Sequence, residues 1–391
     1  MSLPNVKFNV SSNGLGLSTA NIQKIPGMVL TGVTVAGATN VTTGKSYQIF
    51  SKEEAIAMGI ASTGTNVFAY KHISDFYDKA GKGAELWFML VPQAVSMKEM
   101  ADKDLEYGKK LLSDAKGAIR VIGFVKKAGT TETITNGFDA DVDLALIKAH
   151  ALCEDFSSRY KYVRAVVSGN KFNGTVADMK DYSTTTLNRA AVYFANNDGS
   201  EEASIGMLLG HLASIPVQRK LSRVKDGAVE LLNAYFTNGE PVESLDSAWD
   251  AIDNKHYIFL RSFPNRSGYF FTSDKTCTMA NDDFNSLARG LVMDKVCLLS
   301  YAVLTEELSD EVPVTASGTI HPAVIKSWQN AVEKDIKANM TDNGELSGFS
   351  AYIDENQSVL TTNNVDIALK PVPVGYSDSI TANIGFATTL E

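Results

Sequence analysis

The sequence is poor in the residue types that build disulfide scaffolds, zinc sites and membrane spans. Only three of its 391 residues are cysteines, and Cys153, Cys277 and Cys297 have no paired spacing. A disulfide framework or a cysteine zinc site is therefore not expected, and the composition fits a reducing compartment. No apolar stretch reaches the roughly 18 residues that indicate a membrane span. Residues 1–8 lack a basic head followed by an apolar run, so neither a signal peptide nor membrane insertion is predicted.

Motifs that bind cofactors or carry out catalysis are also missing. The histidines form no HExxH pair and have no metal-ligand spacing to another histidine or to a cysteine: His72, His150, His211, His256 and His321. Residues 13–18, NGLGLS, contain Gly-x-Gly but lack the third glycine and the strand-to-helix context of a dinucleotide site. Neither a GxxxxGKS/T phosphate loop nor a GxSxG nucleophile elbow is present. We therefore predict no catalytic residue, no cofactor and no metal, and a protein that is not an enzyme.

Three alternating aspartates invite comparison with a calcium loop. Asp139, Asp141 and Asp143 are not followed by the glycine and the distal glutamate that such a loop requires. Acidic residues also stabilise the N-terminus of a helix through its dipole. We favour this second interpretation, because a helical pattern begins at about residue 141.

The charge balance argues against nucleic acid as a partner. The formal net charge is −9, whereas phosphate neutralisation requires an excess of Lys and Arg. One local basic cluster stands out: Arg219, Lys220, Arg223 and Lys225. Because no aromatic residues are interleaved with these four, we interpret them as a solvated or intersubunit face. Hydrophobic residues make up 44% and charged residues 21% of the chain, which is typical of a soluble globular protein of two or three domains.

Strand and helix patterns alternate through the first part of the chain. The apolar strand-like runs are 25–37, 85–92, 118–125, 161–168 and 189–196. Helical patterns cover about 52–59, 66–80, 99–115, 141–159 and 203–216, and a weaker one covers 176–187. Strands that are apolar throughout and alternate with helices predict a mainly parallel sheet covered on both faces.

A different pattern follows the turn-forming residues 238–241. Two strands, 257–264 and 267–274, precede helices at 282–308 and 322–340, and further strands are expected at about 350–355, 364–370 and 379–387. This order is typical of an α+β domain. We therefore predict an N-terminal arm over 1–24, an α/β domain over 25–240, an α+β domain over 241–376 and a C-terminal arm over 377–391.

Both ends of the chain have the period of two that is typical of amphipathic β-strands. The apolar members alternate with polar residues or glycine: Val6, Phe8 and Val10 at the start, and Ile380, Ala382, Ile384 and Phe386 at the end. Chain termini usually fray unless they are held in a sheet. These ends therefore require a partner edge, in their own subunit or in a neighbour.

Helix 322–340 is amphipathic and carries lysines on its polar face. Lys326, Lys334 and Lys337 share that face, and the opposite stripe is apolar: Val324, Trp328, Ala331, Val332 and Ile336. Taken alone, the pattern indicates only a helix with a solvated side, and Glu333 and Asp335 dilute its positive charge.

Several phrases, taken in order along the chain, resemble the tail-sheath proteins of contractile bacteriophages and related injection machines. They are similar in particular to a sheath-like phage family known as a domain of unknown function. The phrases include LPNVKFNVSSNGLG, IPGMVLTG, KGAIRVIGF, GHLASIPVQRKLSRVKDGA, RSFPNRSGYFFTSD, LARGLVMDKVCLLSYAVL and PVGYSDSITANIGF. The resemblance covers nearly the whole chain. Compared with larger sheaths, an extra peripheral domain is not evident.

The resemblance implies a structural subunit that polymerises around a tail tube and contracts. In that family the C-terminal domain forms the inner layer of the sleeve, and both terminal arms add strands to the sheets of neighbouring copies. It further implies hexameric rings stacked helically, contacts with baseplate and tail terminator proteins, and synthesis in the bacterial cytoplasm before assembly into the tail or a related particle. Lys326, Lys334 and Lys337 would then face an acidic tube surface.

Two other readings of the sequence remain open. A soluble α/β enzyme or small-ligand-binding protein would use the crevice at the carboxyl ends of the parallel strands, with Asn170, Lys171 and Asn196 as polar groups. That reading lacks an acid–base pair. A surface-layer or adhesive module is the third reading, and the absence of a signal peptide counts against it.

Overall fold

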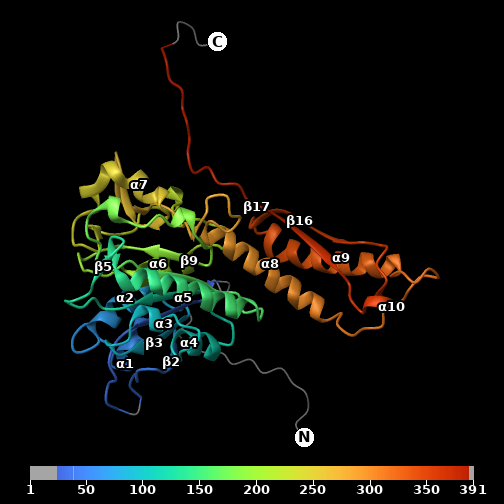
Figure 1. The fold of residues 1–391 in the computed structure, drawn as a ribbon, viewed down its shortest axis with the longest axis horizontal. Helices are drawn as coiled ribbons and strands as arrows, with labels where there is room; N and C mark the ends of the chain where they lie inside the picture. Colours follow the sequence, from blue (N-terminus) through green and yellow to red (C-terminus); the bar gives the residue numbers. More distant parts are fainter. Residues whose placement is uncertain (1–23, 38, 387–391) are drawn as a thin grey trace. The chain divides into compact units, whose positions relative to one another are not determined.

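The computed structural model describes residues 24–37 and 39–386 (Figure 1). Its internal contacts divide the chain into two compact units, the first ending at Leu298 and the second beginning at Leu299. The expected boundary near residue 240 falls inside the first unit. The reason is that strand β12 (Tyr257–Ile258) continues the main sheet by pairing with β9 (Ala190–Tyr193).

The first unit is built on a seven-stranded sheet with the order β12-β9-β7-β4-β1-β3-β2. Its other strands are β1 (Pro26–Thr31), β2 (Ser46–Ile49), β3 (Leu86–Val91), β4 (Val121–Val125) and β7 (Arg164–Ser168). Only β2 pairs in the antiparallel direction, so the predicted mainly parallel sheet is confirmed. Every residue of β1, β4, β7 and β9 is buried, which explains why these strands are apolar throughout rather than alternating.

Helices cover both faces of this sheet. They are α1 (Lys52–Ala57), α2 (Val67–Ala80), α3 (Met97–Met100), α4 (Gly108–Asp114), α5 (Ala140–Ser157), α6 (Ile205–Ser214) and α7 (Trp249–Asn254). Strand β4 shows the arrangement, since adjacent residues point to opposite faces. A Cβ on Gly123 would lie 2.5 Å from Ile205 of α6, whereas Phe124 lies against Gly108 of α4.

Helices α2 and α6 approach each other closely at two glycines of α6. A Cβ on Gly206 would lie 1.8 Å from the carbonyl oxygen of His72, and one on Gly210 would lie 2.4 Å from that of Phe76. The two glycines are four residues apart and therefore share one face of α6. The absence of side chains at these positions lets the two backbones touch.

Two predicted helices are wrong. The pattern over 99–115 is interrupted, and α3 and α4 replace the single helix. Helix α3 begins before residue 99 because Ser96 and Glu99 form a capping box at its N-terminus. Asp102 lies beyond the end of α3 and pairs with Lys148 of α5 at 2.8 Å. The pattern over 176–187 forms two 3₁₀ turns and the short strand β8 (Thr186–Leu187), which pairs with β15 (Cys277–Thr278).

Short hairpins and one long helix complete the first unit. The predicted strand pair around residue 264 is confirmed as β13 (Leu260–Phe263) and β14 (Arg266–Phe271). Smaller two-stranded sheets join β5 (Ile134–Thr135) to β6 (Phe138–Asp139), and β10 (Ala195–Asn196) to β11 (Tyr235–Phe236). Helix α8 (Leu287–Thr305) contains the boundary between the units.

The second unit packs one helix against a two-stranded antiparallel sheet. Helix α9 (Pro322–Ile336) continues as a π-helical segment, Lys337–Thr341, and the sheet pairs β16 (Leu346–Ile353) with β17 (Ile367–Pro373). The short helix α10 (Val359–Thr362) lies between the two strands in sequence. The hydrophobic core cluster of the second unit consists of Ile320, Ile325, Trp328 and Ile353. Burial alternates along the last residues of β16, since Ala351 and Ile353 are buried and Tyr352 is exposed.

Candidate interaction surfaces

The three lysines selected from the sequence lie on the solvent-facing side of α9 and its extension. Lys326, Lys334 and Lys337 are exposed, whereas the opposite side buries Ile325, Trp328, Gln329, Val332 and Ile336. Lys326 donates to Gln329 Oε1 at 3.2 Å, and Lys337 pairs with Asp342 at 2.6 Å. Lys334 forms no ion pair with any residue that the structure describes. The helix therefore presents an exposed face that carries all three lysines.

The β16–β17 sheet is the second surface. One face is covered by α9, and the other exposes Tyr352 and Val372, each 53% accessible. The ammonium group of Lys370 lies 5.9 Å from the ring centroid of Tyr352 on that open face. Within the described ranges, no further strand pairs with either outer edge of this sheet. Unpaired strand edges are templates for the addition of another strand.

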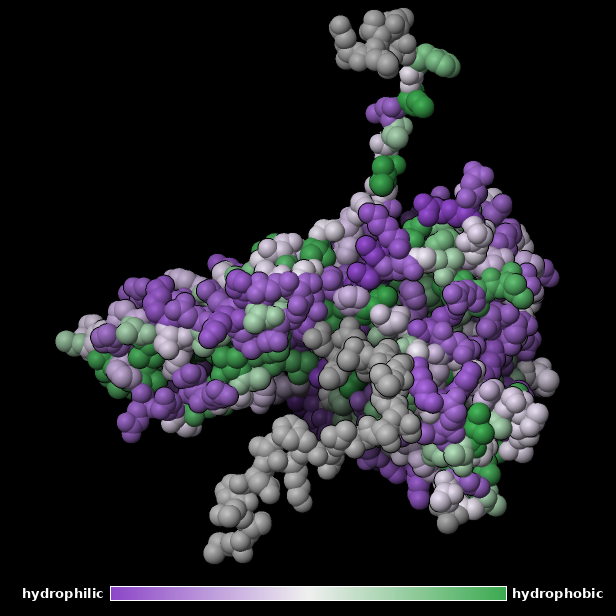
Figure 2. Space-filling model, turned by 180° about the vertical axis from the view of Figure 1, so that it is seen from behind, coloured by the Kyte–Doolittle hydropathy of each residue, from purple (hydrophilic) through white to green (hydrophobic). Residues whose placement is uncertain are grey.

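The C-terminal segment has the predicted alternation but forms no strand within the described chain. Ile380 is 85% accessible, and Ile384 and Phe386 are fully exposed. Figure 2 shows hydrophobic and hydrophilic residues following one another along this segment. Ala382 is likewise exposed. The N-terminal strand residues Val6, Phe8 and Val10 lie outside the described residues. Whether either end completes a neighbouring sheet therefore stays a prediction.

The basic cluster is partly neutralised by one carboxylate. Arg219 pairs with Asp226 at 3.2 Å, and Arg223 pairs with the same aspartate. Lys220 is half-buried and Lys225 is exposed on the same loop. This local pairing lowers the positive charge that the sequence spacing suggested.

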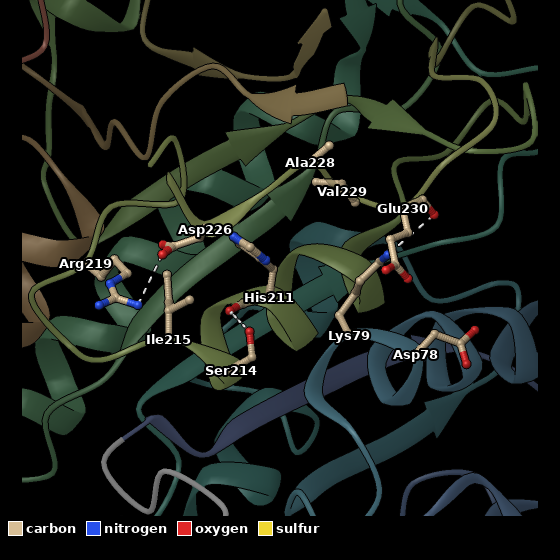
Figure 3. A pocket seen from close by; sticks show the side chains of 10 residues that line it. All are labelled: Asp78, Lys79, His211, Ser214, Ile215, Arg219, Asp226, Ala228, Val229 and Glu230. Carbon is tan, nitrogen blue, oxygen red and sulfur yellow. Dashed lines mark hydrogen bonds and ion pairs between the residues drawn. The ribbon is translucent and has the colours of Figure 1, made fainter. Parts of the chain in front are cut away.

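Arg219 also lines a cavity of about 400 Å³ between the ends of α2 and α6 and the loop that follows α6 (Figure 3). Figure 3 shows Arg219 and Asp226 on one side of His211, and Lys79 with Glu230 on the other. Burial lowers the pKa of His211 to about 4, so this ring is neutral at physiological pH. The lining carries both acidic and basic groups and has no dominant charge.

The polar residues proposed for a ligand crevice are engaged in holding loops together. The Asn170 side chain donates to the carbonyl of Lys126 at 2.8 Å and accepts from Ser168. Asn196 donates to the carbonyls of Ser200 and Glu202 at 2.7 and 3.0 Å. Lys171 pairs with Glu132 at 3.1 Å. The polar groups of these three residues bond to other parts of the protein, so they give no support to the hypothesis of a ligand-binding crevice.

The three alternating aspartates act at helix ends, as the sequence indicated. Asp139 caps α5 by accepting from the amide of Asp141 at 3.0 Å. Asp141 accepts from the amides of Met97 and Lys98 at 2.5 and 3.0 Å, which caps α3. Asp143 pairs with Lys180 at 3.6 Å. Among the residues that the structure describes, no group of His, Cys, Asp and Glu side chains is arranged to hold a metal ion.

One contact in the second unit could not be read from sequence spacing. Glu333, which in the sequence only dilutes the charge of the lysine face, accepts a hydrogen bond from the backbone amide of Ala351 at 2.9 Å. The two residues are 18 positions apart and belong to α9 and β16. The periodicity of the sequence cannot predict a hydrogen bond between a helix side chain and the backbone of a strand.

Comparison with solved structures identifies the fold. A chain in the cryo-EM structure of the anti-feeding prophage (AFP) baseplate matches with a TM-score of 0.65 and 12% identity, covering 99% of this chain and 100% of the other. A chain of the contracted AFP helical sheath matches with a TM-score of 0.64 and 12% identity over 100% of both chains. The contracted sheath complex of the extracellular contractile injection system PVC matches at 0.60 with 13% identity, covering 100% and 98%.

This protein therefore has the fold of contractile sheath proteins, and the predicted resemblance is confirmed at that level. The family comparison is more specific. Residues 3–275 match the N-terminal domain of DUF2586, and residues 283–391 match its C-terminal domain. The chain belongs to the DUF2586 family. No curated protein matches it in a sequence comparison. None of the described helices is long and apolar enough to span a membrane.

Proposed function

We propose that this protein is a structural, non-enzymatic sheath subunit that polymerises around a tail tube and contracts. The observation that carries the proposal is the match of this chain over its whole length to chains of two contracted sheath structures, with 98–100% of each matched chain covered. The exposed alternating residues 380–386 and the unpaired edges of the β16–β17 sheet support it, because a strand-addition contact requires an unpaired strand and an unpaired sheet edge.

The proposed assembly is a helical stack of hexameric rings whose copies are linked by their terminal arms. Main-chain hydrogen bonds supply affinity in such links, and alternating side chains fix their register. The linked units can then rotate and slide without separating. Contraction is driven by the difference in intersubunit packing between the extended and the contracted lattice, which makes the extended state metastable.

The proposed partners are further copies of this chain, an acidic tail tube, and baseplate and terminator proteins. Lys326, Lys334 and Lys337 face the tube in this proposal. An exposed ion pair contributes about 0–1 kcal/mol, so several weak contacts can hold the tube and still release it. Nucleic acid is not a proposed partner. The subunit is made in the bacterial cytoplasm and assembled into a phage tail or a related contractile particle.

Negative-stain electron microscopy of the purified full chain tests the proposal. We expect spontaneous tubes that resemble a contracted sheath. A chain that ends at Tyr376 lacks the alternating segment and should stay monomeric, whereas a chain that lacks only residues 388–391 should still polymerise. A full chain that remains strictly monomeric with both ends ordered on its own body would contradict the proposal.

The alternative function, a soluble α/β enzyme or small-ligand-binding protein, has weaker support. The cavity beside His211 carries mixed charges, and Asn170, Lys171 and Asn196 are committed to internal contacts. A small molecule that raised the melting temperature of the monomeric chain and bound at this cavity would favour the alternative.

A further inference from the structure

The two edges of the β16–β17 sheet differ in their capacity to accept another strand. Phe349 pairs with Pro371 in the register of this sheet. Proline has no amide hydrogen, so this pair cannot exchange both ladder hydrogen bonds. Because the two pair types alternate along an antiparallel ladder, the hydrogen-bonded pairs are those of Ser350 with Lys370 and of Tyr352 with Ala368.

The alternation of hydrogen-bonded and non-hydrogen-bonded pairs decides which backbone groups of each strand point away from the other strand. On β17, the outward residues are Ile367, Leu369 and Pro371, and the strand ends at a second proline, Pro373. Prolines on an edge strand block the addition of further strands because they offer no donor. The outer edge of β17 is therefore blunted over its C-terminal half.

On β16, by contrast, all three outward residues have amide hydrogens: Phe349, Ala351 and Ile353. The central one is already engaged. The amide of Ala351 donates to Glu333 Oε1 at 2.9 Å, and this contact independently shows that the amide points away from β17. The carboxylate of an α9 side chain thus occupies the place where the carbonyl of an added strand would bind.

In the proposed function a strand from a second copy of this chain adds to this sheet, and the outer edge of β16 is the edge with free donors. We propose that Glu333 covers this edge until that strand arrives. This inference rests on the proposed sheath function. The occupant is the C-terminal segment of the second copy. Its apolar set, Ile380 to Phe386 in steps of two, would extend the side of the sheet that buries Ala351 and Ile353 against α9.

The effect of this cover is to slow the addition of a strand to the edge of β16. A free edge with three aligned donors captures strands indiscriminately. A charged acceptor on the central donor raises the barrier to that capture, because the hydrogen bond must break before the new ladder forms. Once the strand is in place, Glu333 is released toward the neighbouring lysine face of α9.

Peptide capture by the full chain tests the inference. The probe is a fluorescent peptide with the sequence of residues 377–391, and its association rate is measured by stopped flow at a protein concentration below that of polymerisation. We expect Glu333→Ala to capture the peptide about tenfold faster than the wild type, since it lacks a charge-assisted hydrogen bond that must otherwise break. Glu333→Gln keeps an oxygen acceptor and should lie between the two.

The controls separate the cover from general effects. Glu355→Ala removes the same charge at an exposed position just beyond β16 and should leave the capture rate unchanged. A peptide N-methylated at alternate residues cannot form the ladder and should not bind. Hydrogen exchange of the β16 segment should be faster in Glu333→Ala than in the wild type, provided that circular dichroism shows the same fold.

Each outcome decides between the two proposals. Equal capture rates for the wild type and Glu333→Ala, with tubes still forming, would overturn the role of Glu333 and leave the sheath proposal standing. A slower rate in Glu333→Ala would overturn it as well and assign Glu333 a structural role. If neither protein captures the peptide and no tubes form, both proposals fail.

Discussion

Arg164 occupies the space in which residue 290 would otherwise place a side chain. A Cβ on Gly290 would lie 1.8 Å from the guanidinium carbon Cζ of Arg164. One turn further along α8, Asp294 accepts from Arg164 Nε at 2.9 Å and from Arg189 Nη1 at 3.2 Å. Arg164 and Asp294 are both almost completely buried. This ion pair holds the first turns of α8 against the first residue of strand β7.

The first prediction concerns the glycine that admits this ion pair. Helix propensity alone would make Gly290→Ala stabilising by about 1 kcal/mol. We expect the opposite, a loss of about 3–5 kcal/mol of unfolding free energy, because the new methyl group displaces the buried Arg164 and breaks its ion pair with Asp294, which then keeps only Arg189. Urea denaturation measures the difference. Gly375→Ala, where a Cβ meets no atom within 4 Å, is the matched control, and a Gly290→Ala protein as stable as this control would contradict the prediction.

The second prediction concerns the crossing of α2 and α6. Gly206→Ala places a methyl group 1.8 Å from the backbone oxygen of His72, and a backbone atom cannot move aside as a flexible side chain can. We expect the helices to separate at a cost of about 1–3 kcal/mol, which is typical of overpacking. The same denaturation measurement checks it. An unchanged midpoint would mean that the two helices pack less closely than described.

The third prediction is a pH dependence at Asp75. Burial raises the pKa of this carboxyl from 3.8 to about 6, and one of its oxygens is buried without a hydrogen-bond partner among the described residues. The folded chain therefore holds a proton between these two pH values that the unfolded chain has released. The contribution of Asp75 to stability is thus largest at acid pH and declines as the pH rises through this window.

Replacing Asp75 with Asn isolates that contribution. Asp75→Asn should be more stable than the wild type by about 1–3 kcal/mol above pH 6, and the difference should vanish near pH 4. Thermal unfolding at a series of pH values measures it. A difference that stays constant across the series would refute the assignment.

The fourth prediction concerns the lysine face of α9. A triple variant with glutamine at positions 326, 334 and 337 should fold normally, because all three side chains are exposed. It should nevertheless give a lower yield of extended sheath on tubes, with the larger effect at low salt, where exposed charges are least screened. Electron microscopy of assembled particles counts the extended sheaths. Recovery of extended sheath at the normal yield would remove these lysines from the tube contact.

The sequence by itself determined the features that depend on the spacing of apolar residues along a single strand or helix. Apolar runs placed the strands of the main sheet, because a buried parallel strand needs apolar residues on both faces. The helical period of α9 likewise separated Trp328 and Val332 from the exposed lysines. The period of two at the C-terminus remains a sequence observation, since a strand exists only when an edge pairs with it.

Only the tertiary structure decided the contacts between residues that are distant in sequence. Arg164 and Asp294 are 130 positions apart, and nothing near either residue signals the partner. The single helix predicted over 99–115 was wrong for the same reason, because the pairing of Asp102 with Lys148 of another helix competes with the helical pattern. The hydrogen bond from Ala351 to Glu333 depends in the same way on how α9 packs against β16. Local propensity is set by neighbouring residues, whereas these choices are set by which surfaces the folded chain brings together.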